Sequence, residues 1–231
     1  MADRSPIPAR IPLGGSGLSV APLGWGMWRL HGTDVAAARE RIDAALEAGC
    51  TLFDTADIYG LGTAGGFGAA EALLGQVLVQ APQIRAQIVL ATKAGIEPGV
   101  PFNSSADYLV GACEASLRRL GVDLLQVHRP DVLAHPAEVA RAFDTLHRQG
   151  QIRAAGVSNY TVAQTRALLG HLTLPLASLQ PEYSPLALDP LYDGLLDLAL
   201  ERGIAVLACS RGRRWRRGGL RAQPPTSAPR G

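Results

Sequence analysis

Lysine is almost missing from this sequence. Its 231 residues include 22 lysines and arginines, and only one of these, Lys93, is a lysine. An ammonium is compact, sits on a flexible stem and shifts its pKa on burial, which a guanidinium does not do. A single surviving lysine therefore predicts a chemical role for Lys93. The alternative is chance retention in an arginine-biased composition.

Cysteines and long apolar runs are also scarce. Cys50, Cys113 and Cys209 are odd in number and widely spaced, which excludes a disulfide framework and a zinc knuckle. No apolar run reaches the length of a membrane span, and the first twelve residues lack the hydrophobic segment of a signal peptide. We therefore expect a cytoplasmic location without membrane contact. Apolar residues make up 47% of the chain and charged residues 18%, which excludes wholesale disorder.

Acidic residues are absent from the last part of the chain. Residues 211–231 contain seven arginines and no acid, whereas residues 1–210 contain 15 basic and 20 acidic residues, a net charge of −5. This Arg-, Gly-, Pro- and Ser-rich tail is typical of disorder. A basic surface spread across the fold is missing, so we expect no nucleic-acid partner. The alternative is a tail that grips phosphates non-specifically, with steep salt dependence.

Short apolar runs alternate with helical patterns along residues 1–210. A small hairpin is expected around Gly14-Gly15. Predicted strands cover 19–25, 51–54, 88–92, 124–127, 154–157, 178–180 and 204–208, and predicted helices cover 34–49, 68–79, 105–120, 136–148, 161–169 and 190–202. Such alternation favours parallel strands joined by right-handed crossovers. A barrel and an open doubly wound sheet both satisfy it.

Two observations favour the barrel. The turn Gly24-Trp25-Gly26 lacks the third glycine of a dinucleotide-binding fingerprint, which weakens the open sheet. Polar residues also follow the ends of successive predicted strands, namely Asp54, Lys93, His128, Ser158-Asn159 and Gln180. In an eight-stranded barrel these ends form one face, where catalytic groups are placed.

Five segments carry a specific resemblance. They are Phe53-Asp54-Thr55-Ala56-Asp57-Ile58-Tyr59-Gly60, Ala91-Thr92-Lys93, Val127-His128-Arg129-Pro130, Gly156-Val157-Ser158-Asn159-Tyr160 and Leu179-Gln180-Pro181-Glu182-Tyr183-Ser184. In this order they resemble the aldo-keto reductase family, over about residues 11–210, in the style of bacterial aryl-alcohol-dehydrogenase-like oxidoreductases. The resemblance implies an α/β fold, a (β/α)8 TIM barrel. It also implies reduction of small-molecule aldehydes or ketones with NADPH, less often NADH.

The resemblance assigns a role to each of four catalytic residues. Tyr59 would donate a proton to the developing alkoxide, and Lys93 would lower the pKa of its hydroxyl. Asp54 would keep the Lys93 ammonium charged and oriented, and His128 would hydrogen-bond the substrate carbonyl. Read singly, Asp54 could cap a turn, Tyr59 could be a rim residue and His128 could bond backbone. The ordered combination favours the family.

The resemblance also places the cofactor. Ser158, Asn159 and Gln180 would hold the nicotinamide carboxamide, although Ser158-Asn159 could instead cap the next helix. Further cofactor contacts are implied for Gly26, Met27 and Ser210. Trp28 would line the substrate pocket beside Trp25, but Trp25, Met27 and Trp28 could equally be core residues. The remaining histidines, His31, His135, His147 and His171, lack metal-ligand spacing, and we predict no metal site.

The match departs from the family pattern in three places. After strand 204–208 the family continues with a phosphate-gripping loop, a helix and an eighth strand, whereas composition changes at Arg211 as a shifted reading frame would produce. A barrel without its eighth strand leaves two edges and cannot close. Cys209 stands where the family has an aromatic ring beside the nicotinamide, and the connection before His128 is short. The alternative to an enzyme is therefore an inert truncated reductase fragment or a non-catalytic binding protein.

Overall fold

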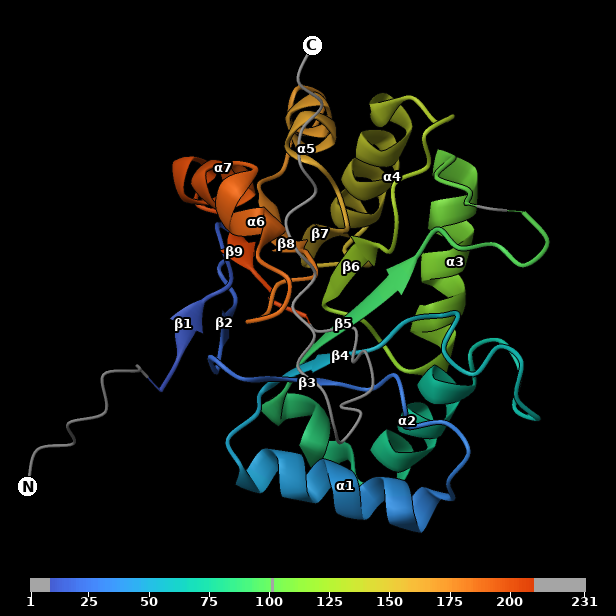
Figure 1. The fold of residues 1–231 in the computed structure, drawn as a ribbon. Helices are drawn as coiled ribbons and strands as arrows, with labels where there is room; N and C mark the ends of the chain where they lie inside the picture. Colours follow the sequence, from blue (N-terminus) through green and yellow to red (C-terminus); the bar gives the residue numbers. More distant parts are fainter. Residues whose placement is uncertain (1–8, 101, 210–231) are drawn as a thin grey trace, which may run out of the picture.

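Seven parallel strands form the main sheet of the computed structural model, which describes residues 9–100 and 102–209 (Figure 1). They are β3 (Gly24–Gly26), β4 (Leu52–Asp54), β5 (Val89–Ala94), β6 (Leu124–Val127), β7 (Ala154–Ser158), β8 (Leu176–Gln180) and β9 (Ala205–Val206). Each strand pairs with its neighbours in sequence. A doubly wound sheet reverses its strand order at a switch point, so this consecutive order supports the predicted barrel.

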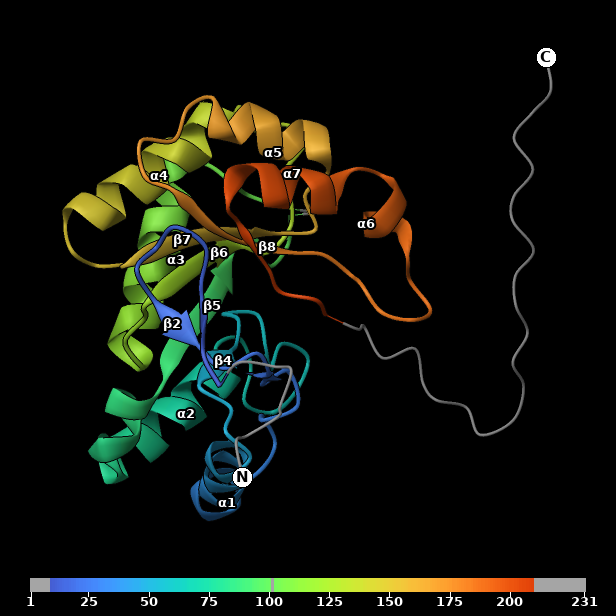
Figure 2. The ribbon, with the colours of Figure 1, turned by 90° about the vertical axis from the view of Figure 1, so that its left-hand side faces the viewer.

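The sheet curls without closing within the described residues. There β3 pairs only with β4, and β9 pairs only with β8, so both strands are edges. Figure 2 views the molecule from the side of the β1–β2 hairpin, with α1 and α2 at the bottom and α4, α5 and α7 at the top. The expectation of a barrel incomplete after its seventh strand is confirmed for this part of the chain. The tail predicted for residues 211–231 lies outside the described residues.

Helices follow one another around the outside of the sheet (Figure 1). They are α1 (Val35–Glu47), α2 (Ala69–Gln80), α3 (Ala106–Arg119), α4 (Pro136–Arg148), α5 (Val162–Leu169), α6 (Asp189–Tyr192) and α7 (Leu195–Arg202). As predicted, the Asp34 side chain caps α1 by accepting the Ala37 N–H at 2.8 Å. Thr161 caps α5 in a capping box with Gln164, so Ser158-Asn159 does not serve as that cap.

Two predicted elements are divided in the structure, and one element was not predicted. The strand predicted at 19–25 divides, because β2 (Ser19–Val20) turns aside to pair with β1 (Ile11–Pro12). The helix predicted at 190–202 divides into α6 and α7 at Gly194, whose φ of 86° lies in the left-handed region that ends a helix. A short 3-10 helix, η1 (Pro82–Gln87), joins α2 to β5 and was not predicted.

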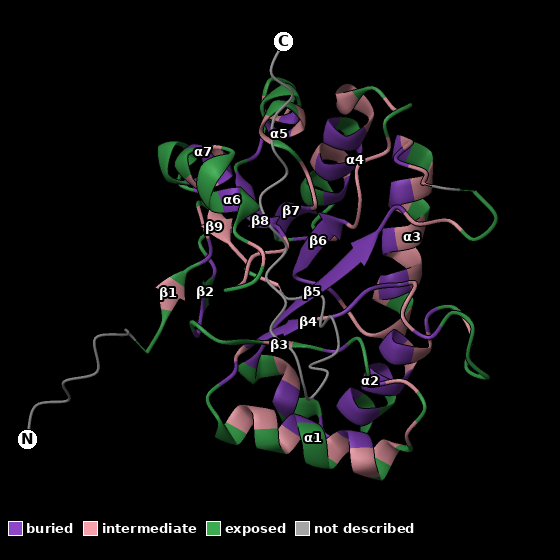
Figure 3. Ribbon diagram, viewed as in Figure 1, coloured by how far each residue is buried: buried purple, intermediate pink, exposed green. Residues whose placement is uncertain are grey.

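Apolar side chains fill both surfaces of the sheet. The central strands β5 to β8 are buried throughout, whereas the helices are buried only on the side that faces them (Figure 3). Between strands and helices the largest buried side chains include Phe53, Phe143, Ile42 and Leu90. The β1–β2 hairpin contributes Leu13, Leu18 and Val20 to a cluster with residues from the starts of the strands. The hairpin therefore covers the N-terminal end and leaves the C-terminal end for a site.

The short connection before His128 is held by a buried carboxylate. Asp123 accepts the Leu90 N–H at 2.9 Å and pairs with Arg85 at 2.9 Å and Arg153 at 3.2 Å. Strand β6 then runs in regular register with β5, and the His128 N–H donates to Ala94 O at 2.8 Å. The short connection does not displace His128 from its strand end.

Candidate active site

A cavity of about 770 Å³ lies at the C-terminal ends of the strands. It is lined by residues at the ends of the seven strands of the sheet or in the loops that follow them: Trp25, Gly26, Trp28, Arg29, Asp54, Tyr59, Lys93, His128, Arg129, Ser158, Asn159, Gln180 and Cys209. The fold therefore brings together all four predicted catalytic residues. It also brings Gly26, Trp28, Ser158, Asn159 and Gln180 to the same cavity.

An ion pair between Lys93 and Asp54 forms the floor of the site. The Lys93 Nζ lies 2.5 Å from Asp54 Oδ2 and also donates to Thr55 O at 3.1 Å. Only 3% of the Lys93 side chain is exposed. A buried charge is costly unless it is paired and hydrogen-bonded, and here it is both. The interpretation of Asp54 as a simple turn cap is therefore not needed.

The loop after β4 holds Tyr59 above this ion pair. The Tyr59 N–H donates to Ala56 O at 3.1 Å, and Tyr59 O accepts the Ala70 N–H of α2 at 3.1 Å. The tight turn that follows requires glycine at position 60: its φ is 110°, and a Cβ there would lie 2.6 Å from Gly66 O. The Lys93 Nζ lies 5.5 Å from the centre of the Tyr59 ring.

The pKa of Tyr59 is set by opposing effects. Burial raises the pKa of the Tyr59 hydroxyl above its ordinary value, and the neighbouring Lys93 ammonium opposes this increase. Burial lowers the pKa of Lys93, but the Asp54 carboxylate and Tyr59 outweigh burial and raise it. The sequence predicted a net lowering for Tyr59. In the structure Lys93 does lower the pKa of Tyr59, but burial raises that pKa by more. Tyr59 and Lys93 therefore both stay protonated at neutral pH.

His128 and Asn159 complete the opposite wall. The His128 ring packs edge-to-face on Tyr59, with ring centres 5.8 Å apart. The Asn159 Nδ2 donates to His128 O at 2.9 Å and to Ser158 Oγ at 2.8 Å. Among the described residues Asn159 is the only non-glycine with a positive φ, 62°. Backbone held in this region concentrates at functional sites.

A buried acceptor at the cavity has no hydrogen-bond partner among the described residues. It is Gln180 Oε1, whose companion Nε2 donates to Asp54 Oδ2 at 3.1 Å. Such an acceptor requires a donor, and a carboxamide NH2 would supply one. Beside it, Ser158 Oγ donates to Gln180 O at 3.0 Å. These residues could hold a nicotinamide.

The remaining predicted positions divide between cavity and core. Trp28 is 55% exposed at the cavity mouth, and Trp25 lines the cavity while packing edge-to-face on Phe53. Met27 is 1% exposed, packs in the core and does not line the cavity, which favours the core alternative over a cofactor contact. Ser210 lies outside the described residues.

Sequence reasoning missed Gln126 and Asp57. Gln126 donates from Nε2 to Asp54 Oδ1 at 3.1 Å, and its signal was a polar residue inside an apolar strand, two positions before His128. Asp57 is completely buried, and its carboxyl has no hydrogen-bond partner among the described residues. Burial and then the nearby Glu71 raise the pKa of Asp57 to about 8.

The buried Asp57 predicts a loss of stability as pH rises. The unfolded chain releases this proton near 3.8, while the folded chain keeps it up to about 8, so stability falls between these values. We expect Asp57→Asn to flatten this part of the pH dependence and to gain roughly 5 kcal/mol relative to the wild type between pH 4 and pH 9. Urea unfolding at several pH values would measure it. A constant difference between the two chains would contradict the prediction.

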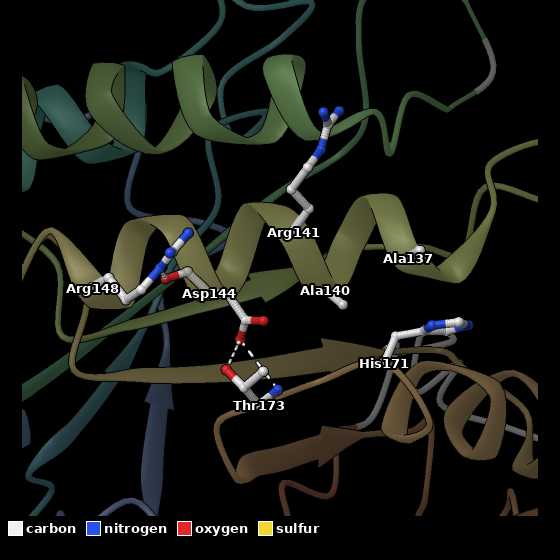
Figure 4. Close-up of a pocket in the computed structure, with 7 residues that line it drawn as sticks. All are labelled: Ala137, Ala140, Arg141, Asp144, Arg148, His171 and Thr173. Carbon is white, nitrogen blue, oxygen red and sulfur yellow. Dashed lines mark hydrogen bonds between the residues drawn. The ribbon is translucent and has the colours of Figure 1, made fainter.

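The other cavity described here does not bring together titratable groups in the way that the cavity around Tyr59 does. A cavity of about 400 Å³ lies in the outer layer between α4 and the segment that follows α5, where Asp144 accepts from Thr173 Oγ1 at 2.8 Å (Figure 4). Across residues 9–100 and 102–209 no group of three His, Cys, Asp or Glu could hold a metal ion. In the same part of the chain, no helix has the length and apolarity needed to cross a membrane.

Comparison with known proteins supports the geometry. The sequence model of the aldo/keto reductase family matches residues 22–211. The chain is 49% identical over 215 residues to a 6-dehydroglucose reductase of Novosphingobium aromaticivorans, covering 91% of this chain and 71% of that protein. A 6-dehydroglucose reductase of Agrobacterium fabrum is 36% identical, with 84% and 68% covered.

The fold agrees with solved structures as well. The holo form of an aldo-keto reductase from Bacillus halodurans superimposes with a TM-score of 0.73 at 32% identity, covering 86% of this chain and 65% of that one. The chain thus spans about two thirds of the length of these relatives. With its family model, its relatives and its curved parallel sheet in agreement, the chain belongs to the aldo/keto reductase family.

Proposed function

We propose that this protein reduces an aldehyde or ketone to an alcohol with NADPH or NADH, using Tyr59 as the proton donor. The observation that carries the proposal is the convergence of Tyr59, Lys93, Asp54 and His128 on one cavity. Pairs of titratable groups whose environments shift their pKa values mark sites of acid–base chemistry. Tyr59 and Lys93, whose pKa values are both raised, are such a pair.

The chain's own residues account for the proton transfer. Gln180, Ser158 and Asn159 would hold a dihydronicotinamide, which would supply the hydride when bound. The Tyr59 O–H then gives its proton to the carbonyl oxygen, so the products are an alcohol and a tyrosinate, which regains a proton from solvent. The Lys93 ammonium stabilises the tyrosinate charge, and Asp54 keeps that ammonium in place. His128 donates a hydrogen bond to the carbonyl oxygen and orients it.

The residues at the cavity fit a nicotinamide. Gln180 Oε1 is a buried acceptor in need of a donor, and Ser158 and Asn159 lie beside it at the ends of their strands. Gly26 leaves open space into the cavity, because a Cβ at this position would meet no atom within 4 Å. Gln180, Ser158 and Asn159 would hold the carboxamide.

The substrate class follows from the relatives and the lining. Two relatives carry the name 6-dehydroglucose reductase, and one of them is 49% identical over nearly the whole chain. The cavity presents many hydrogen-bonding groups, among them Arg29, Arg129 and Asn159, and it is large enough for a six-carbon sugar beside a nicotinamide. A hydroxylated sugar aldehyde is therefore our first candidate substrate.

Titration with NADPH tests the proposal. Trp25 and Trp28 line the cavity, so NADPH binding should quench intrinsic fluorescence. Oxidation of NADPH should then follow addition of a sugar aldehyde or a reactive aromatic aldehyde. Folded protein that neither quenches nor turns over would instead favour an inert reductase fragment, a reading consistent with the sheet left open between β9 and β3 in the described residues.

Filling the space at Gly26 should block the cofactor. Gly26→Val adds a branched side chain at the cavity, and its Cβ would meet no protein atom within 4 Å, so the fold should persist. We expect at least tenfold weaker NADPH binding, or roughly 1.4 kcal/mol, by fluorescence titration. Gly111→Val is a suitable control, because its Cβ also lies in open space but outside the cavity. Gly17→Val is not, because the φ of 73° at Gly17 would strain a valine. Unchanged affinity in Gly26→Val would argue against this placement of the nicotinamide.

A further inference from the structure

A row of four residues crosses the interior of the sheet at one level. In the strand register Lys93 of β5 stands beside Gln126 of β6, Gln126 beside Gly156 of β7, and Gly156 beside Ser178 of β8. Lys93 is 3% exposed, and Gln126 and Ser178 are completely buried. Three polar side chains on four neighbouring strands are unusual where apolar side chains normally fill the barrel.

Glycine at position 156 lets the row connect. A Cβ there would lie 2.1 Å from Ser178 Oγ and 3.1 Å from Gln126 Cγ, so any side chain would separate these two residues. With the gap open, Ser178 Oγ donates to Gln126 Oε1 at 3.2 Å across β7. This bond fixes which end of the Gln126 amide faces the serine, and its Nε2 is left to point at Asp54.

The row ends on the carboxylate that holds Lys93. Gln126 Nε2 donates to Asp54 Oδ1 at 3.1 Å, whereas the Lys93 ammonium and Gln180 Nε2 both approach Oδ2, at 2.5 Å and 3.1 Å. The two oxygens of Asp54 therefore have different partners. A donor fixed on Oδ1 prevents the carboxylate from rotating about its Cβ–Cγ bond, and Oδ2 remains directed at Lys93.

We propose that Gln126 and Ser178 are positioning residues that orient Asp54, and through it the Lys93 ammonium, beneath Tyr59. The inference deepens the proposed function and depends on it for its catalytic meaning. Neither residue lines the cavity, so neither contacts substrate or cofactor. A polar pair buried only to satisfy its own hydrogen bonds would leave Lys93 unaffected by its removal, which distinguishes a merely structural role.

The single lysine allows a direct test without turnover. Selective nitrogen-15 lysine labelling gives one side-chain Nζ signal, that of Lys93, whose hydrogen exchange and pH dependence can be followed by NMR. In Gln126→Met, which keeps the length and removes both polar ends, we expect Lys93 ammonium protons to exchange roughly 10- to 100-fold faster. Ser178→Ala should act in the same direction with a smaller effect, because Gln126 loses only the bond that fixes its amide.

A pH readout and a matched control complete the experiment. Gln126→Glu places a titrating carboxyl against Asp54 Oδ1, so the Lys93 signal should gain a pH transition that the wild type lacks. Gln76→Met makes the same chemical change as Gln126→Met on the exposed side of α2. Lys93 exchange in Gln126→Met equal to that in Gln76→Met would overturn the proposal. If Gln126→Met does not fold, the proposal is tested with Ser178→Ala and Gln126→Glu instead. Unchanged Lys93 exchange in Ser178→Ala and no new pH transition in Gln126→Glu would then overturn it.

The outcomes separate this inference from the proposed function. A Lys93 signal that responds in a chain that binds no NADPH would keep the positioning role and reject the reductase activity. Turnover together with a Lys93 signal that does not respond to Gln126→Met would keep the reductase activity and reject the positioning role. If both hold, Gln126→Met should lower kcat while the aldehyde KM changes little, since the row acts on the proton donor and not on substrate contacts.

Discussion

The Tyr59→Phe variant is expected to reduce kcat for aldehyde reduction by about 10²- to 10⁴-fold, the usual contribution of a positioned general acid. Burial raises the pKa of Tyr59, so the hydroxyl is protonated at neutral pH and available as the donor. The phenylalanine ring keeps the edge-to-face contact with His128 but has no proton to give. NADPH binding should remain, because the carboxamide partners proposed above are elsewhere in the cavity.

Steady-state kinetics and fluorescence titration together check this result. Tyr192→Phe removes the same hydroxyl from a side chain that is 78% exposed on α6, and it should leave both measurements unchanged. Turnover in Tyr59→Phe within threefold of the wild type would remove Tyr59 from the mechanism. Loss of NADPH binding in the same variant would instead indicate that the substitution disturbs the cavity.

The second large effect is on stability and concerns Arg119→Ala. Glu71 of α2 is completely buried and accepts from Thr92 Oγ1 at 2.5 Å, Ser116 Oγ at 3.1 Å and Arg119 Nε at 2.6 Å. This network joins α2 and α3 to the outer side of β5, the strand that carries Lys93. Removing one partner of a buried ion pair leaves an uncompensated charge, so we expect a loss of roughly 3–5 kcal/mol in the free energy of unfolding.

Urea unfolding followed by circular dichroism would measure the loss. Arg118→Ala changes the neighbouring arginine of α3, for which the described part of the chain shows no ion pair, and should cost much less. Adding Glu71→Gln to Arg119→Ala removes the buried charge and should recover part of the stability. A cost in Arg119→Ala no greater than that in Arg118→Ala would show that the network is not a major source of stability.

Local pattern was sufficient for most elements of the fold. Asp34 has the side chain that caps α1, and the apolar run at 88–92 matches a strand buried on both faces. The pattern failed where two local predictions met. Ser19–Val20 pairs with β1 in the hairpin expected around Gly14-Gly15, so these residues are not part of the strand predicted at 19–25.

The candidate site shows the same division. We predicted Asp54, Tyr59, Lys93 and His128 from the single lysine, from their positions at strand ends and from the family resemblance. The fold brings these four residues to one cavity. The same reasoning left Met27 undecided between cavity and core, and burial placed its side chain in the core. It gave no hint of Gln126 or Ser178 as a connected pair, because a bond between residues 52 positions apart exists only through strand register and the gap at Gly156.

By itself, the sequence determined the alternation of strands and helices and the family, since both depend on residue type and order. Only the tertiary structure decided the charge states and orientations. Burial reverses the expected net shift in the pKa of Tyr59 and keeps Asp57 protonated to about pH 8, because desolvation depends on neighbours from the whole chain. The single lysine of the sequence is held by Asp54, and the hydrogen bonds that orient Asp54 come from residues on β5, β6 and β8.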